Sequence, residues 1–254
     1  MNGMMLALQF FTVLPIRKQL PLGRKEVTAM YIALPFVGAV IGLLMYGVSV
    51  LLFNTMEMSP FFTAVFIVLT GIMLTGGLHL DGWADTGDAF FSYQDRTKRL
   101  EILEDPRLGA FGTMSLVSLI LVKVALFHEV LIQGLGGWAL FVVIPILSRV
   151  GMNIYFTTMQ PAKNKGIAYF FTENMGTKGV LIGAVASGIG VLIILGYHLE
   201  SVLTPLLLFA AIGIGIMLFR NWSKKHFGGI TGDLAGAFIE GMEAILWLIV
   251  LASL

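Results

Sequence analysis

Long apolar stretches make up most of the chain and alternate with shorter polar ones. Several of them approach or exceed the roughly 20 residues that a helix needs to cross a bilayer, and a lipid-exposed segment has to satisfy its own backbone hydrogen bonds, as a helix does. The sequence therefore predicts an all-α polytopic integral membrane helix bundle of about seven transmembrane helices, forming one domain over residues 1–254. The expected spans are 28–53, 60–78, 109–127, 138–158, 179–196, 203–219 and 232–254.

Two features of the first fifty residues add detail to this scheme. The apolar stretch 4–14 is too short to span, and the first basic residue, Arg17, follows it, which is the reverse of the order in a cleavable signal peptide. We expect an N-terminal interfacial or re-entrant helix that ends at Pro15. In the first span, Gly38 and Gly42 have the spacing of small residues that lets membrane helices approach closely.

Charged residues are scarce and unevenly placed. The chain is 57% hydrophobic and 12% charged, whereas an ordinary soluble domain is about 25% charged, and its mean hydropathy is +0.89. Of the 16 Lys and Arg residues, 14 lie in polar segments on one side of the predicted membrane, and the short loops opposite hold none; the segments are 17–26, 79–108, 160–178 and 220–231. The positive-inside rule puts these segments and the N-terminus in the cytoplasm.

Composition also limits the chemistry. Because the chain has no Cys, disulfides and thiolate nucleophiles are excluded, and any metal has to take oxygen or imidazole ligands. Hard cations such as Mg²⁺ are therefore favoured. The net charge of +1 and the lack of a basic run with interleaved aromatic residues give no support for a nucleic-acid partner.

The densest polar chemistry follows the second span, in the sequence HLDGWADTGD at 79–88. Asp81, Asp85 and Asp88 stand at i, i+4 and i+7, so on a helix they share one face. Three such carboxylates repel one another and raise each other's pKa unless a cation intervenes, and Mg²⁺ or Mn²⁺ suits carboxylate and water ligands. The pattern favours a divalent metal that bridges substrate phosphates, although a solvated acidic loop would contain the same residue types.

A histidine and two glycines complete this stretch. His79 has three interpretations: a metal ligand, a general base or an interfacial imidazole. Gly82 and Gly87 each weaken a helix by up to about 1 kcal/mol relative to Ala. We expect them where a diphosphate has to come close to the backbone.

A second candidate segment, 101–112, leads into the third span. Asp105 precedes Pro106 and is therefore expected to be extended. Arg107 at the membrane edge can clamp a phosphate or anchor the chain to lipid headgroups.

Carboxylates also occur in the last span. Asp233, Glu240 and Glu243 fall at offsets 0, 7 and 10 and share one helical face. Isolated charges inside a bilayer are costly and usually face a partner. We expect Glu240 and Glu243 to pair with Lys123 or Arg149 of other spans, and Asp233, nearer the cytoplasmic end, to join the metal site.

These residues together resemble a known family. The sequence at 79–88 is similar to the HLDGxADTxD signature of the cobalamin synthase family, the adenosylcobinamide-GDP ribazoletransferases. Other stretches that resemble the family are QFFTVLP at 9–15, PFVG at 35–38, DPRLGAFG at 105–112 and GGITGDLAGA at 228–237. The resemblance runs from near the N-terminus to the last span. It departs at Trp83, where a small aliphatic residue is common, and at Ala235, where Leu is usual.

The resemblance implies a Mg²⁺-dependent multi-pass enzyme of the bacterial inner membrane. It would join adenosylcobinamide-GDP to α-ribazole or its 5′-phosphate, release GMP and form adenosylcobalamin or its 5′-phosphate late in vitamin B12 assembly. Its partners would be these two substrates and membrane lipid. Which ribazole form is preferred and how many subunits assemble, a homo-oligomer included, are left open by the sequence.

The hypothesis for the metal site combines the resemblance with the spacing of the carboxylates. Asp81, Asp85 and Asp88, with Asp233 as a fourth ligand, would hold one or two Mg²⁺ ions on the GDP diphosphate. Asp88 or His79 would take the proton from the attacking ribazole hydroxyl.

Cationic side chains would bind the substrate phosphates. Arg107 is the first candidate, and Lys98 and Arg99 are further ones, with Asp105 beside them as a substrate-binding residue.

Two alternatives predict different activities. A lipid-synthesis enzyme of the CDP-alcohol phosphotransferase kind also has an Asp-Gly followed by spaced Asp residues, but it has Ala-Arg after the Asp-Gly, whereas here Ala84 is followed by Asp85. A cation transporter would use Asp233, Glu240 and Glu243 with Lys123 as a relay at the membrane midplane.

Overall fold

A computed structural model describes residues 2–93, 95–199 and 201–254. Within this part of the chain the regular structure is entirely helical, apart from one isolated bridge between Pro161 and Ile230. The helices are α1 Asn2–Phe11, α2 Arg24–Ser49, the π-helical η1 Val50–Thr55, α3 Pro60–Thr75, α4 Leu78–Ser92, α5 Arg96–Ile102, α6 Ala110–Ile132, α7 Trp138–Thr157, α8 Ile167–Glu173, α9 Thr177–His198, α10 Leu203–His226 and α11 Gly232–Ser253.

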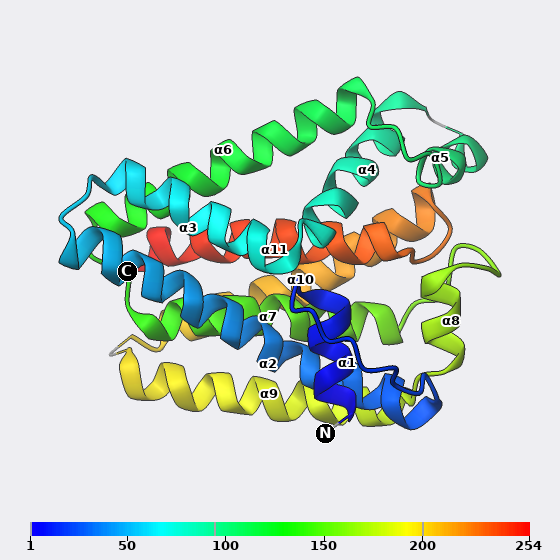
Figure 1. Ribbon diagram of the computed structural model, residues 1–254, viewed down its shortest axis with the longest axis horizontal. Helices are drawn as coiled ribbons and strands as arrows, with labels where there is room; N and C mark the ends of the chain where they lie inside the picture. Colours follow the sequence, from blue (N-terminus) through cyan, green and yellow to red (C-terminus); the bar gives the residue numbers. More distant parts are fainter. Residues whose placement is uncertain (1, 94, 200) are drawn as a thin grey trace.

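The number of long apolar helices confirms the predicted membrane bundle. In the described residues six are long and apolar enough to cross a membrane: α2 with η1, α6, α7, α9, α10 and α11. A seventh is reached if α3 and α4, which are bent by 95° where they meet, count as one span. The long helices run side by side, whereas α1 lies across them (Figure 1).

Two glycines produce the sharp bend between α3 and α4. Gly76 and Gly77 have φ values of 64° and 75°, in the left-handed region that favours glycine. The amide of Gly77 donates to the carbonyl of Ile72 at 3.0 Å, which ends α3. As a result, the acidic stretch starts a new helix that leaves the direction of the span before it.

Helix α7 forms the centre of the bundle, because nearly every residue along it is buried. The Gly38 and Gly42 face of α2 packs on it. A Cβ on Gly42 would lie 1.8 Å from the carbonyl oxygen of Phe141, the group that Pro145, four residues on, cannot bond within α7. The predicted close approach of helices at these two glycines is confirmed.

The four basic segments lie at one end of the bundle. The start of α2, the loop between α4 and α6, the α8 region and the end of α10 all gather at the right in Figure 1, so the one-sided arrangement expected from charge counting is present in the fold. The N-terminal helix is also present, but it ends at Phe11 rather than at Pro15. It packs so closely on α2 that a Cβ on Gly3 would lie 2.3 Å from that of Ala29.

Candidate active site

A cavity of about 410 Å³ opens among α1, α2, α4, α7, α8 and α11, near the end where the basic segments gather. This volume lies in the usual range for small-molecule sites, about 300–1,000 Å³. Its charged and imidazole lining residues are His79, Asp81, Glu104, Lys163, Lys165 and Asp233. Residues from four separate segments of the sequence therefore meet around one space.

Close packing of α4 against α11 brings Asp81 and Asp233 to the same cavity. A Cβ on Gly82 would lie 2.6 Å from the backbone oxygen of Asp233, and one on Gly236 would lie 3.1 Å from the backbone of His79. These glycines let the two helix backbones touch. The acidic stretch is helical, as its spacing predicts.

The expectation that Gly82 and Gly87 leave room for a diphosphate is wrong. Gly82 faces Asp233, and a Cβ on Gly87 would lie 2.2 Å from the side-chain oxygen of Ser115 on α6. Trp83 is also fixed to α6, because its indole nitrogen donates to the carbonyl of Ser115 at 3.0 Å. Both glycines are therefore needed for helix packing.

The segment at 228–233 connects α11 to the loop that carries the two cavity lysines. Ile230 donates its amide to Gln160 and accepts from Ala162, each at 2.9 Å. Thr231 then caps α11 by accepting from the amide of Leu234 at 3.2 Å, and its hydroxyl lies 3.3 Å from a carboxylate oxygen of Asp233. This pairing holds the lysine loop next to Asp233.

Lys163 and Lys165 were not among the residues predicted for the site. Lys163 lies 2.8 Å and Lys165 3.3 Å from the same carboxylate oxygen of Glu104, and these contacts hold the pKa of Glu104 below its usual range. The sequence indicated these lysines only through the count of basic residues on one side of the membrane. That count predicted the side of the membrane on which they lie but not that they line the cavity.

The predicted metal ligands come together only in part. Asp81 and Asp233 line the cavity, whereas Asp85 does not, although it is close enough for its charge to interact with both of them and with Asp88. Among the described residues no three His, Asp or Glu side chains are arranged to hold a metal ion by themselves. Two carboxylates nonetheless fit Mg²⁺, which is commonly bound through one or two carboxylates together with substrate phosphates and water.

Asp88 is held at the start of α6. Its carboxylate accepts from the amide of Gly112 at 3.1 Å, and Gly109, the N-cap residue of α6, has no side chain with which to cap the helix. Asp88 is 8% exposed, and its carboxylate lies at the positive end of the α6 dipole. In this arrangement Asp88 joins α4 to α6 and does not line the cavity.

The predicted phosphate clamp is paired with its own neighbour. Arg107 donates from Nε and Nη2 to the two carboxylate oxygens of Asp105 at 2.9 and 2.7 Å. These bonds lower the pKa of Asp105 to about 2. The Arg107 side chain is 86% exposed, and neither residue lines the cavity.

Arg99 and Lys98 are likewise bound to protein groups. Arg99 is 5% exposed, and its guanidinium donates to the carbonyls of Tyr93 at 2.6 Å and Phe90 at 3.3 Å and bonds the ring of His226 at 2.8 Å. The ammonium group of Lys98 lies 5.1 Å from the ring centre of Tyr93. Arg99 therefore ties α5 to the ends of α4 and α10.

His79 stands out among the cavity residues because it lacks a protein partner. It is 3% exposed, and neither ring nitrogen has a hydrogen-bond partner. An unpaired buried polar group costs about 1–3 kcal/mol and calls for an explanation such as a bound ligand.

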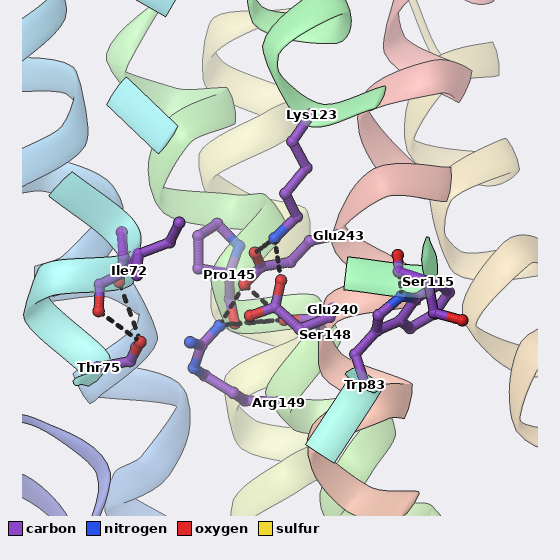
Figure 2. Close-up of polar contacts among 11 residues, drawn as sticks. Ile72, Thr75, Trp83, Ser115, Lys123, Pro145, Ser148, Arg149, Glu240 and Glu243 are labelled. Carbon is purple, nitrogen blue, oxygen red and sulfur yellow. Dashed lines mark hydrogen bonds and ion pairs between the residues drawn. The ribbon is translucent and has the colours of Figure 1, made fainter. Parts of the chain in front are cut away.

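A second polar cluster, here called the ion network, lies deeper in the bundle (Figure 2). Lys123 of α6 pairs with Glu240 and, at 3.1 Å, with Glu243 of α11, and Arg149 of α7 lies 2.6 Å from Glu243. Two positive and two negative charges therefore balance one another. The predicted pairing of Glu240 and Glu243 is confirmed.

The fold and its cavity define a multi-pass membrane protein with carboxylates and lysines facing one small-molecule site. The family model described as cobalamin-5-phosphate synthase matches residues 3–251, and the chain belongs to that family. This match decides against the CDP-alcohol phosphotransferase and transporter alternatives.

Curated relatives cover nearly the whole chain and are named adenosylcobinamide-GDP ribazoletransferase. The one from Geobacillus thermodenitrificans is 37% identical over 98% of this chain and 95% of its own. Those from Acinetobacter baumannii and Clostridium tetani are 35% and 32% identical, over 97% and 98% of this chain and 95% and 96% of theirs. No solved structure matches the chain.

Proposed function

We propose that this protein joins adenosylcobinamide-GDP to α-ribazole or its 5′-phosphate, with Mg²⁺ as its metal. A ribazole hydroxyl attacks the phosphorus that carries the corrinoid, the bond from that phosphorus to the bridging oxygen breaks, and GMP leaves with that oxygen. The observation that carries the proposal is the shared cavity of Asp81, Asp233 and the two lysines, in a chain whose relatives have this activity in their names.

The carboxylates of α4 and α11 would hold Mg²⁺ against the diphosphate. Asp81 and Asp233 line the cavity, and Asp85 interacts with both by charge. When bound there, Mg²⁺ supplies neutralisation of the charge that builds up on the phosphate oxygens during displacement. Through the metal, these carboxylates would also orient the diphosphate relative to the cavity.

Lys163 and Lys165 replace Arg107, Lys98 and Arg99 as the proposed phosphate-binding residues. Both lysines line the cavity and share one acidic partner, Glu104. A phosphate oxygen can compete with Glu104 for them, since an ammonium group is a flexible point charge with three donors.

We assign the proton of the attacking hydroxyl to His79 rather than to Asp88, because Asp88 is bonded to the α6 amide. Neither ring nitrogen of His79 is bonded to a protein group, so one of them is available to accept the hydroxyl hydrogen.

The orientation that fits this chemistry has the cavity facing the cytoplasm. The basic segments then lie inside, as the positive-inside rule requires, and the N-terminus is cytoplasmic. In a bacterium the membrane would be the inner one. Cysteine labelling of introduced surface residues in intact cells tests this orientation.

One assay tests the activity. Purified protein in liposomes is incubated with adenosylcobinamide-GDP, α-ribazole and Mg²⁺, and GMP and the cobalamin product are measured. We expect both products in equal amounts and neither after EDTA, with recovery on adding Mg²⁺ back. Folded protein that yields no product would overturn the proposal.

A further inference from the structure

One end of the cavity is lined by aromatic rings, here called the aromatic wall: Phe10, Phe11, Tyr31, Phe156 and Phe171. The rings form a connected set, with centres 5.1 Å apart for Phe10 and Phe171, 5.7 Å for Tyr31 and Phe171, and 5.2 Å for Tyr31 and Phe156. They come from α1, α2, α7 and α8, so distant parts of the chain converge on this wall.

His79 connects the aromatic wall to the charged end of the cavity. Its ring centre lies 6.2 Å from that of Phe11, and Asp81 follows two residues later on α4. Both imidazole nitrogens are buried without a hydrogen-bond partner from the protein. A polar group of a bound ligand can supply that partner.

The space beside the wall is too large to be an ordinary packing defect. It opens to the outside and has a volume of about 410 Å³, which is in the range of small-molecule sites and far above the water-sized voids of a packed interior. An aromatic cluster that only filled the core would close around itself. These rings instead border a cavity.

We infer that the aromatic wall binds the planar base of α-ribazole and directs its ribose hydroxyl to His79. The inference rests on the proposed function and says which substrate occupies which end. The cavity has the size for a nucleoside, whereas the corrin ring is much larger and has to stay outside, with only its diphosphate reaching Asp81 and Asp233.

The chemistry of the wall favours the ribazole base over guanine. Dimethylbenzimidazole is apolar apart from one free ring nitrogen, and it can stack on aromatic side chains. Guanine has a carbonyl, an amino group and a ring N–H that would each lose water, and the wall offers them only the hydroxyl of Tyr31. Leaving such groups unpaired is costly.

Kinetics with both substrates varied separately test the inference, with Phe171→Leu as the first variant. Loss of a stacking ring is expected to raise the KM for α-ribazole about tenfold, with the KM for adenosylcobinamide-GDP unchanged. Phe36→Leu is the matched control, because Phe36 lies on α2, is 55% exposed and does not line the cavity; both KM values should stay as in the wild type.

His79 is tested by two substitutions in the same assay. His79→Phe keeps an aromatic ring at this position but removes the acceptor nitrogen, so kcat should fall about a hundredfold while the KM for α-ribazole changes little. His79→Gln retains a hydrogen-bonding group and should keep more activity than His79→Phe.

Binding of α-ribazole alone supplies a readout that does not depend on turnover. Equilibrium dialysis with folded Phe171→Leu protein should show about tenfold weaker α-ribazole binding and unchanged GMP binding. Weaker GMP binding, or a raised KM for adenosylcobinamide-GDP only, would overturn the inference. A wild-type protein that binds both ligands but gives no product would overturn the proposed function alone. If Phe171→Leu does not fold, Phe10→Leu takes its place, because Phe10 is 36% exposed, and the same outcomes are required.

Discussion

The protein contains two clusters of charged side chains that differ in how their charges are satisfied. In the ion network, Lys123, Arg149, Glu240 and Glu243 are paired with one another inside the bundle. In the cavity, Asp81 and Asp233 interact unfavourably with each other, and His79 has no partner.

This difference distinguishes the charged side chains that stabilise the fold, in the ion network, from those proposed to bind substrate, in the cavity. Charges in an apolar bundle are tolerated when they neutralise one another, and the ion network meets that condition without any ligand. The cavity carboxylates repel one another, so they gain most from a cation and a phosphate that arrive from outside. The predictions below for Asp81, Asp233 and Glu243 would fail if the two clusters had the opposite roles.

The largest effect is expected for Asp81→Asn and Asp233→Asn. Each removes a proposed Mg²⁺ ligand, and because metal charge stabilisation contributes several kcal/mol, kcat/KM should fall about a thousandfold. The transfer assay in liposomes measures this. Asp95→Asn is the matched control, since Asn keeps the N-cap bond to Lys98 at the start of α5. Full activity of the Asp81→Asn protein would show that the metal is not bound by Asp81 of α4, and full activity of the Asp233→Asn protein would show the same for Asp233 of α11.

The ion network should respond to mutation through stability. Glu243→Gln leaves Lys123 paired with Glu240 alone and removes the carboxylate that is paired with Arg149. Breaking a buried ion pair typically costs about 3–5 kcal/mol of stability. Thermal unfolding in detergent should show a clear drop in Tm, while enzyme that stays folded still turns over substrate.

A double variant is the control for charge balance. Replacing Lys123 and Glu240 together by Met removes one charge of each sign, so it should cost less than Lys123→Met alone. An equal loss in both would show that the pairing contributes little.

Much of the bundle could be predicted because hydrophobicity and charge act locally. The spans follow from apolar length, and the pairing of Glu240 and Glu243 follows from the cost of isolated charges in a bilayer. The bend at Gly76 and Gly77 was not predicted, because the sequence through α3 is apolar and gives no sign of a break. The change of direction depends on the left-handed backbone conformation of the two glycines.

The cavity was harder to predict because its members depend on tertiary packing. Lys163 reaches it only through the backbone pairing of its loop with Ile230, and nothing local in the sequence marks that contact. Asp88 shares a helix face with Asp81, as the spacing predicts. However, α6 packs beside it, and the carboxylate of Asp88 accepts a hydrogen bond from the amide of Gly112. Local periodicity could not show which carboxylates remain free.

Asp88 offers a smaller effect that separates capping from chemistry. Asn retains an oxygen that can accept from the amide of Gly112, so Asp88→Asn should keep most of the activity. Asp88→Ala leaves the start of α6 uncapped and should destabilise the protein by about 1–2 kcal/mol. Loss of activity in a stable Asp88→Asn protein would return Asp88 to the metal site or to the role of base.

The smallest effect is expected for Arg107→Ala. An exposed ion pair contributes at most about 1 kcal/mol, and the Arg107 side chain is 86% exposed and bonded to Asp105, away from the cavity. The KM for adenosylcobinamide-GDP should therefore change less than about threefold, whereas Lys163→Ala should raise it by about tenfold or more, since a charge-assisted hydrogen bond contributes about 1.5–3 kcal/mol. If Arg107→Ala has the larger effect, the diphosphate is bound at the α6 entrance and the cavity lysines serve only to hold Glu104.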